Sequence, residues 1–160
     1  MIDKEFYMEW FDELTSLGGI IFYSINILLL LTLRFYIHTL WLIIGLIFIL
    51  VSFYLIRFFY FKERPLFQSK GRSLFTYLDA SSFPSVHAAR ITFLSMTYIN
   101  LIDNTYFRML ILFIWILVLL SRYFLKKHYF TDIAVGTILS IIYFFLISSG
   151  IPYILKLFGF

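Results

Sequence analysis

Arginine, histidine and serine side chains recur at the edges of the polar stretches of this chain, where they could bind and transfer a phosphoryl group. Guanidinium groups match phosphate oxygens in geometry and charge, so several converging arginines indicate a bound phosphoryl group. A histidine beside an acid indicates a nucleophile or a base. The residues of this set are Arg57, Arg64, Ser85, His87, Ser121, Arg122, His128 and Asp132.

The spacing of His128 and Asp132 predicts a specific contact. The two residues are four positions apart, which on a helix places them one turn apart on the same face. The carboxylate would then accept a hydrogen bond from one ring nitrogen, and the other nitrogen would be left as a nucleophile.

Two prolines predict how the other phosphate-binding candidates are held. Pro84 suits the first turn of a helix, so we expect Ser85 and the amide of Val86 at a helix amino terminus, where unpaired N–H groups attract anions. Pro65 disfavours helix at the residue before it, so we expect Arg64 to start a loop.

The composition places these residues in a membrane protein. Of the 160 residues, 62% are hydrophobic and 14% are charged, whereas soluble domains average about 45–50% and about 25%. A membrane-spanning helix takes about 20 apolar residues, so the chain has room for about five or six spans and for no separate soluble domain. The absence of cysteine excludes disulfides, thiolate metal sites and a cysteine nucleophile.

The charge distribution favours anionic membrane partners. The net charge is +4, although five of the nine acidic residues lie within the first thirteen positions, so the rest of the chain is distinctly basic. In a membrane protein we interpret this as affinity for anionic lipid surfaces or for a phosphorylated substrate, and not for nucleic acid.

The apolar runs predict an all-α integral-membrane bundle, a single domain over residues 1–160. About five transmembrane helices are expected, at 15–33, 39–56, 85–102, 106–120 and 131–148. An amino-terminal helix, residues 1–19, would lie along the membrane interface and would be a sixth span if it were counted as one.

The amino-terminal helix is predicted from its amphipathic pattern. Apolar residues fall on one helical face, with Glu5, Glu9 and Asp12 on the other. No basic n-region or small-residue cleavage site is present, so we expect the helix to be retained. The apolar residues are Ile2, Phe6, Trp10, Leu14 and Leu17.

Counting the crossings predicts where the polar connections meet. An even number of spans separates the connection 57–84 from the connection 121–130, and the amino-terminal helix lies on the same side. These two connections are therefore the expected active-site loops.

The same residues form three blocks that resemble the signature of the type 2 phosphatidic acid phosphatase family. The blocks are Arg57 with Arg64-Pro65 seven positions later, then Pro84 to His87, then Ser121-Arg122 with His128 and Asp132. The third block matches completely. Arg57 stands where the family usually has Lys, and Val86 where it most often has Gly. The start of the chain around Leu17-Gly18 is also similar to polyprenyl-diphosphate phosphatases of this family.

The resemblance implies roles for the matching residues. His128 would attack phosphorus to give a phosphohistidine, Asp132 would hold its ring, and His87 would protonate the leaving oxygen and then activate water. No metal and no cofactor is implied. The phosphate oxygens would be held by Arg57, Arg64, Ser85, the amide of Val86, and Arg122.

Arg90 lies outside the signature but close to it. An intramembrane charge is costly unless it faces protein or a cavity, and Arg90 follows His87 by three residues. Two interpretations stay open: recognition of the substrate headgroup, or a structural pair with a residue such as Asp79.

The sequence therefore predicts a multi-pass enzyme of the cell membrane that hydrolyses a lipid phosphate, with undecaprenyl or dolichyl diphosphate as the expected substrate. The alternatives are a phosphatidate or phosphatidylglycerophosphate phosphatase, a lipid phosphotransferase, and a catalytically silent protein that binds lipid phosphate. The excess of lysine and arginine on the active-site face favours the cytoplasm, but similar lipid phosphatases mostly act on the other side, so we expect an extracytoplasmic site. The sequence does not predict an oligomeric state.

Overall fold

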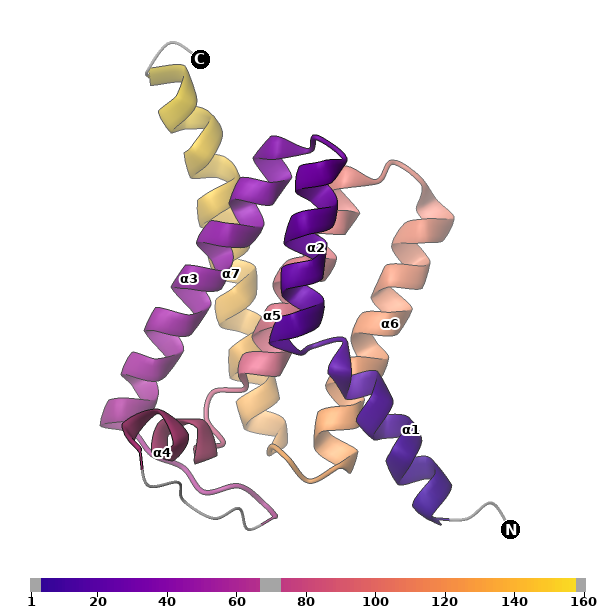
Figure 1. The fold of residues 1–160 in the computed structure, drawn as a ribbon, viewed down its shortest axis with the longest axis vertical. Helices are drawn as coiled ribbons and strands as arrows, with labels where there is room; N and C mark the ends of the chain where they lie inside the picture. Colours follow the sequence, from indigo (N-terminus) through magenta and orange to yellow (C-terminus); the bar gives the residue numbers. More distant parts are fainter. Residues whose placement is uncertain (1–3, 67–72, 158–160) are drawn as a thin grey trace.

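Seven α-helices make up the described part of the chain, and it contains no β-strand. The computed structural model describes residues 4–66 and 73–157; the side chains of 4–7, 75 and 152–157 are not described. The all-α bundle that the sequence predicts is confirmed (Figure 1). The helices are α1 (Lys4–Ser16), α2 (Ile20–Thr32), α3 (Tyr36–Phe59), α4 (Leu74–Ala80), α5 (Val86–Leu101), α6 (Thr105–Phe124) and α7 (Phe130–Leu157).

Four segments of the described chain are long and apolar enough to cross a membrane, one fewer than the predicted number of about five. They are Met8–Thr32, Tyr36–Phe59, Thr105–Phe124 and Phe130–Ile151. The difference is α5, which has only 16 residues and carries several buried polar side chains. Because α5 packs against α2, α3, α6 and α7, most of its surface faces protein and need not be apolar.

The start of the chain differs from the expected boundary. The span predicted at 15–33 is interrupted, since α1 ends at Ser16 and α2 begins only at Ile20. Turn-type hydrogen bonds close the end of α1, including Gly18 N to Thr15 O at 3.0 Å. The α1 helix then diverges from α2 and packs along the lower half of α6 (Figure 1). Of the predicted amphipathic pattern, Ile2 and the side chains of Glu5 and Phe6 lie outside the described residues.

The bundle holds α5 at its centre through close packing of α3 and α7. The ring of Phe93 occupies the space beside Gly45 on α3, where a Cβ would come within 2.3 Å of it. Phe144 of α7 packs against the same ring, with centroids 5.7 Å apart. The hydroxyl of Ser140 donates to the carbonyl of Ala89 at 2.7 Å. These contacts fix the position of α5 against both neighbours.

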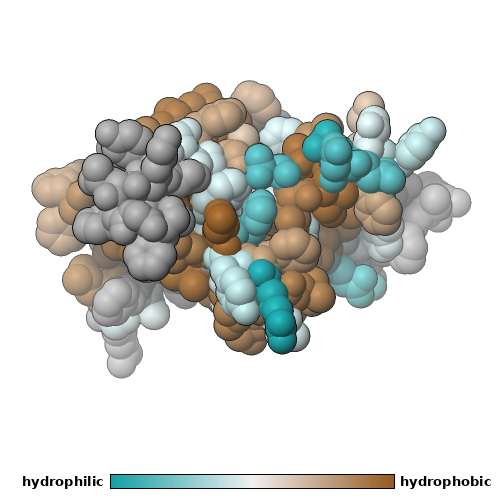
Figure 2. Space-filling view, turned by 90° about the horizontal axis from the view of Figure 1, so that it is seen from above, coloured by the Kyte–Doolittle hydropathy of each residue, from teal (hydrophilic) through white to brown (hydrophobic). Residues whose placement is uncertain are grey.

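The outer surface is apolar, as a membrane protein requires. Large hydrophobic side chains of α2, α3, α6 and α7 are exposed along the bundle. Seen from above in Figure 2, hydrophobic residues cover most of the described rim, and hydrophilic residues gather in a few groups.

Polar connections that are distant in the sequence meet at one end of the bundle, as the count of crossings predicts. In Figure 1, α1, α4 and the turn between α6 and α7 lie together at the lower end, while the turns α2–α3 and α5–α6 lie at the upper end. Arg122 of α6 donates to the hydroxyl of Thr15 in α1 at 2.7 Å, and Ser82 before α5 contacts Asp132 of α7.

Candidate active site

A cavity of about 910 Å³ lies at this lower end, and we call it the arginine cavity. Its polar wall contains three arginines and two histidines. Its apolar wall comes mainly from α2, whose first residues follow directly on the break after α1. The described lining residues are Ser16, Gly19, Ile20, Ile21, Phe22, Ile25, Leu50, Tyr54, Arg57, Arg64, Asp79, Val86, His87, Arg90 and His128.

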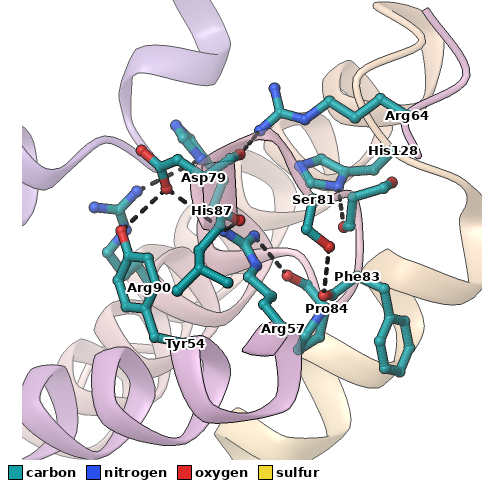
Figure 3. Close-up of polar contacts among 12 residues, drawn as sticks. Tyr54, Arg57, Arg64, Asp79, Ser81, Phe83, Pro84, His87, Arg90 and His128 are labelled. Atoms are coloured by element: carbon teal, nitrogen blue, oxygen red, sulfur yellow. Dashed lines mark hydrogen bonds and ion pairs between the residues drawn. The ribbon is translucent and has the colours of Figure 1, made fainter. Parts of the chain in front are cut away.

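Arg57 and Arg64 are fixed by contacts to backbone carbonyls around α4 (Figure 3). Arg57 lies in the last turn of α3 and is 2% exposed, and its Nη2 donates to Pro84 O at 2.9 Å. Its Nε has no hydrogen-bond partner among the described residues. Arg64 donates through Nη2 to Asp79 O at 2.6 Å. Burial lowers the pKa of Arg64 from its ordinary value.

The cavity carries an excess of positive charge. Among its described lining residues, Asp79 supplies the only carboxylate, against three guanidinium groups. That carboxylate lies 3.5 Å from Arg57 Nη1 and accepts from the hydroxyl of Tyr54 at 3.0 Å, yet its side chain is 67% exposed. An anion in the cavity would therefore meet uncompensated positive charge at close range.

Arg90 lies on the cavity wall with little internal compensation. It is buried, its closest polar contact is 3.5 Å from Nη2 to His87 Nδ1, and its Nε has no hydrogen-bond partner among the described residues. The expected structural alternative, a direct pair with Asp79, is absent from the described ion pairs of the chain, where Asp79 binds Arg57 instead. Arg90 lines the cavity beside His87, Tyr54 and Asp79 (Figure 3).

His128 has a defined tautomer. Its Nδ1 lies 2.7 Å from the carbonyl oxygen of Ser82, and because a carbonyl only accepts, Nδ1 carries the proton. Burial lowers the pKa of His128 well below its ordinary value, and the neighbouring guanidinium groups of Arg122 and Arg64 lower it further. The ring is therefore neutral near pH 7, with an unprotonated Nε2 on the side away from Ser82.

The predicted bond between His128 and Asp132 is wrong. His128 lies in the turn before α7, which begins at Phe130, so the spacing of four is not a helical turn. The carboxylate of Asp132 is fully buried and binds Ser82 Oγ, the Tyr129 amide at 3.0 Å, and Lys62 Nζ at 2.6 Å. Asp132 therefore reaches His128 indirectly, through Ser82.

The helix amino terminus expected at Ser85 and Val86 is confirmed, although Pro84 precedes the N-cap and does not lie in the first turn. The α5 helix begins at Val86, and Ser85 is its N-cap, with its hydroxyl accepting from the Ala88 amide at 3.4 Å. Val86 lines the cavity, whereas Ser85 is buried behind it and donates its amide to Asp132 O at 3.0 Å.

Arg122 also lies behind the cavity wall. It is 3% exposed and donates through Nη1 to Thr15, while its Nε has no hydrogen-bond partner among the described residues. Ser121, its neighbour in the signature, bonds within α6 to Val118 O at 2.7 Å. The structure thus gathers the predicted residues in two layers. Those lining the cavity are Arg57, Arg64, Val86, His87, Arg90 and His128, and those behind it are Ser85, Arg122 and Asp132.

Two contributors to the site carried no signal in the sequence. Ser82 bridges Asp132 and His128, and Lys62 contacts the buried carboxylate. The Ser82–His128 contact joins residues 46 positions apart, and the Lys62–Asp132 contact joins residues 70 positions apart. No local sequence pattern predicts contacts over such separations. The described residues contain no group of three or more histidines, cysteines or acids that could hold a metal ion.

A protein-family model matches most of the chain. The model of the PAP2 superfamily matches residues 35–156, from the start of α3 into α7. The chain belongs to the PAP2 superfamily. No curated protein and no solved structure matches it.

Membership of the PAP2 superfamily indicates a phosphatase of lipids. It agrees with the apolar bundle of a multi-pass membrane protein. The match does not include α1 or α2, so the similarity around Leu17-Gly18 to polyprenyl-diphosphate phosphatases stays a prediction.

Proposed function

We propose that this protein removes a terminal phosphate from a polyprenyl diphosphate, such as undecaprenyl or dolichyl diphosphate, whose tail stays in the bilayer. The observation that carries the proposal is the arginine cavity, which joins an arginine-rich wall to an apolar wall from α2. A phosphate group fits the first wall through charge and hydrogen bonds. The start of a lipid tail fits the second.

In the proposed reaction, Nε2 of His128 attacks the terminal phosphorus. The N–P bond forms as the bridging P–O bond breaks, and the leaving lipid phosphate takes a proton from His87, which holds that proton once the bound diphosphate has offset the positive charge of the arginines. Water then attacks the phosphohistidine, His87 takes its proton, and inorganic phosphate leaves. The tautomer of His128 supports this role, because Nδ1 is already engaged by Ser82 O.

The arginines supply charge stabilisation during transfer. Arg57, Arg64 and the Val86 amide stand in the cavity wall, where they can meet the equatorial oxygens. Arg122 and Ser85, one layer behind, are assigned to the same task by their place in the signature, and Asp132 supports His128 through Ser82. Fixed cationic donors of this kind stabilise a transition state in which charge spreads over the oxygens.

Arg90 is our candidate for the phosphate that is not transferred. Three lining guanidinium groups and one carboxylate give the wall a net charge of +2, and Arg122 adds a fourth guanidinium directly behind it, so the total exceeds the charge of a monophosphate dianion. A lipid diphosphate brings a second phosphate, and Arg90 lines the cavity with a single side-chain contact among the described residues, 3.5 Å to His87, so its guanidinium is placed to bind that phosphate. This favours a diphosphate over a monophosphate substrate.

A substrate panel tests the proposal. Purified protein in detergent with a chelator should release inorganic phosphate fastest from a polyprenyl diphosphate and more slowly from phosphatidate and phosphatidylglycerophosphate. Phosphorylated lipid products are scored as well, since their appearance would show a phosphotransferase. Release that appears only after a divalent metal is added would contradict the mechanism.

An arm of the same panel tests Arg90. Arg90→Gln should raise KM for the diphosphate about tenfold, the typical loss of a charge-assisted hydrogen bond, and change KM for phosphatidate less than about twofold. Arg108→Gln, at the other end of the bundle, is the matched control and should change neither. An equal loss on both substrates would remove Arg90 from the diphosphate site.

A further inference from the structure

Lys62 reaches from the connection after α3 to the buried end of α7. Its Nζ lies 2.6 Å from Asp132 Oδ1 and 3.2 Å from the Thr131 hydroxyl. The Asp132 side chain is fully buried, whereas that of Lys62 is 26% exposed. Lys62 is the only lysine or arginine that pairs with Asp132 among the described ion pairs.

Two aromatic rings hold the ammonium group in this position. Nζ lies 4.4 Å from the ring centroid of Tyr129 and 5.9 Å from that of Phe83. Contacts of this kind stabilise a cation over the face of a ring. They favour one placement of a side chain that would otherwise be free to move.

The backbone of Lys62 is attached to the segment that supports His128. Its amide donates to Ser81 Oγ at 3.2 Å, and its carbonyl accepts from the Ser82 amide at 2.7 Å. Ser82 in turn donates its hydroxyl to Asp132 and accepts from His128 Nδ1 through its carbonyl. The backbone of Lys62 therefore contacts Ser82 directly, and its side chain contacts Ser82 through Asp132.

We propose that Lys62 is a positioning residue for phosphoryl transfer, acting through Asp132 and Ser82 to hold His128 with Nδ1 protonated and Nε2 available to the cavity. The inference rests on the proposed function and deepens it. Lys62 is not among the described residues that line the cavity, and its Nζ is engaged by Asp132 and Thr131, so we assign it no contact with substrate.

The physical reason is the cost of a buried carboxylate. A fully buried charge is tolerated when it is paired and hydrogen-bonded, and removing one partner leaves it uncompensated. Without Lys62, Asp132 would be stabilised by drawing water or another cation into its place. Ser82 would move with it, and the carbonyl that orients His128 would shift.

The test separates positioning from binding. Lys62→Met should lower kcat at least about tenfold, since small displacements of a reacting group cost up to about 100-fold, and should leave KM within about twofold. Lys62→Arg should restore at least a third of kcat. Lys126→Met is the matched control, because Lys126 is an exposed lysine on the same end of the bundle, and it should behave as wild type.

A double-mutant cycle tests whether Lys62 acts through Asp132. If Lys62 acts through Asp132, adding Lys62→Met to Asp132→Asn should lower kcat by less than about twofold beyond the single Asp132→Asn variant. If Lys62→Met does not fold in detergent, Lys62→Gln replaces it with the same expected result, because the amide keeps a donor and loses the charge.

Three results would overturn the proposal. The first is a wild-type kcat in Lys62→Met, and the second is a rise in KM without a fall in kcat. The third is a double variant whose loss of kcat equals the product of the losses in Lys62→Met and Asp132→Asn. Failure of the proposed function is distinguished from these, because it would appear as a wild-type protein that releases no phosphate from any lipid of the panel.

Discussion

At the scale of single residues, the central feature is a neutral histidine beside several fixed positive charges. Burial and the guanidinium groups of Arg122 and Arg64 lower the pKa of His128 well below 6.5. The proposed nucleophile therefore stays unprotonated at pH values where an ordinary histidine is largely charged. In the proposed reaction, the arginines that bind phosphate would also keep the attacking nitrogen free.

Imidazole NMR tests this state directly. In ¹⁵N-labelled protein at pH 6.5, the His128 ring should show protonated Nδ1 and unprotonated Nε2, with assignment by His128→Gln among the three histidines. Because the folded pKa is lowered, the unfolded state binds the extra proton below pH 6.5. The stability contributed by His128 is therefore present above pH 6.5 and is lost as the pH falls below it. An imidazolium signal at pH 6.5 would contradict the account.

The residue types and spacings predict which residues form the site better than they predict the contacts among those residues. Arg57, Arg64, His87 and His128 do meet at one cavity, as the three signature blocks indicate. The predicted His128–Asp132 bond is absent, because it assumed one continuous helix through both residues, whereas α7 begins only at Phe130. The roles of Ser82 and Lys62 arise from chain segments that only the tertiary fold brings together.

At the scale of helices, the site depends on how closely α7 approaches the start of α5. Gly136 of α7 faces the backbone of Ser85, and a Cβ there would come within 2.6 Å of Ser85 O. Because residue 136 has no side chain, α7 lies close enough to the start of α5 for the Ser85 amide to donate to Asp132 O. The same close approach lets the Asp132 carboxylate accept from the Ser82 hydroxyl. One glycine thus sets the spacing between the two halves of the site.

Gly136→Ala should push the two helices apart. We expect a loss of about 1–3 kcal/mol in unfolding free energy, the usual cost of overpacking, with a fall in phosphate release that exceeds the loss of folded protein. Gly150→Ala on the same helix is the matched control, since nothing lies within 4 Å of its added Cβ. Thermal unfolding in detergent measures both, and equal behaviour of the two variants would show that α7 is not held by this contact.

The helix boundaries explain which parts of the fold were predictable. Long apolar runs gave α3 and α6 to within four residues at each end, whereas α7 continues to Leu157, nine residues beyond the predicted end at 148. The break at residues 17–19 was missed because the apolar pattern continues across Gly18 and Gly19. Gly18 also packs near the site, where an added Cβ would lie 3.2 Å from His87 O.

At the scale of the whole molecule, all the catalytic candidates lie at one end of the bundle, so the orientation in the membrane decides where phosphate is released. We propose an extracytoplasmic site, against the excess of lysine and arginine on that face. The chain has no cysteine, so single cysteines report on each end without background.

Labelling in intact cells tests the orientation. Lys126→Cys lies at the active-site end and Asp103→Cys at the opposite end, where the Asp103 side chain is 99% exposed. A membrane-impermeant maleimide added outside should label Lys126→Cys at once and Asp103→Cys only after permeabilisation. The reverse pattern would place the active site in the cytoplasm.

The phosphohistidine itself is the most direct test of the account. Rapid alkaline quenching during turnover of a lipid diphosphate labelled in its terminal phosphate should give a labelled protein, stable in alkali and labile in acid. His87→Ala should keep the label longer, because it lacks the group that activates water. The account predicts no label in His128→Ala, and equal labelling of that variant, or wild-type turnover without any labelled protein, would contradict it.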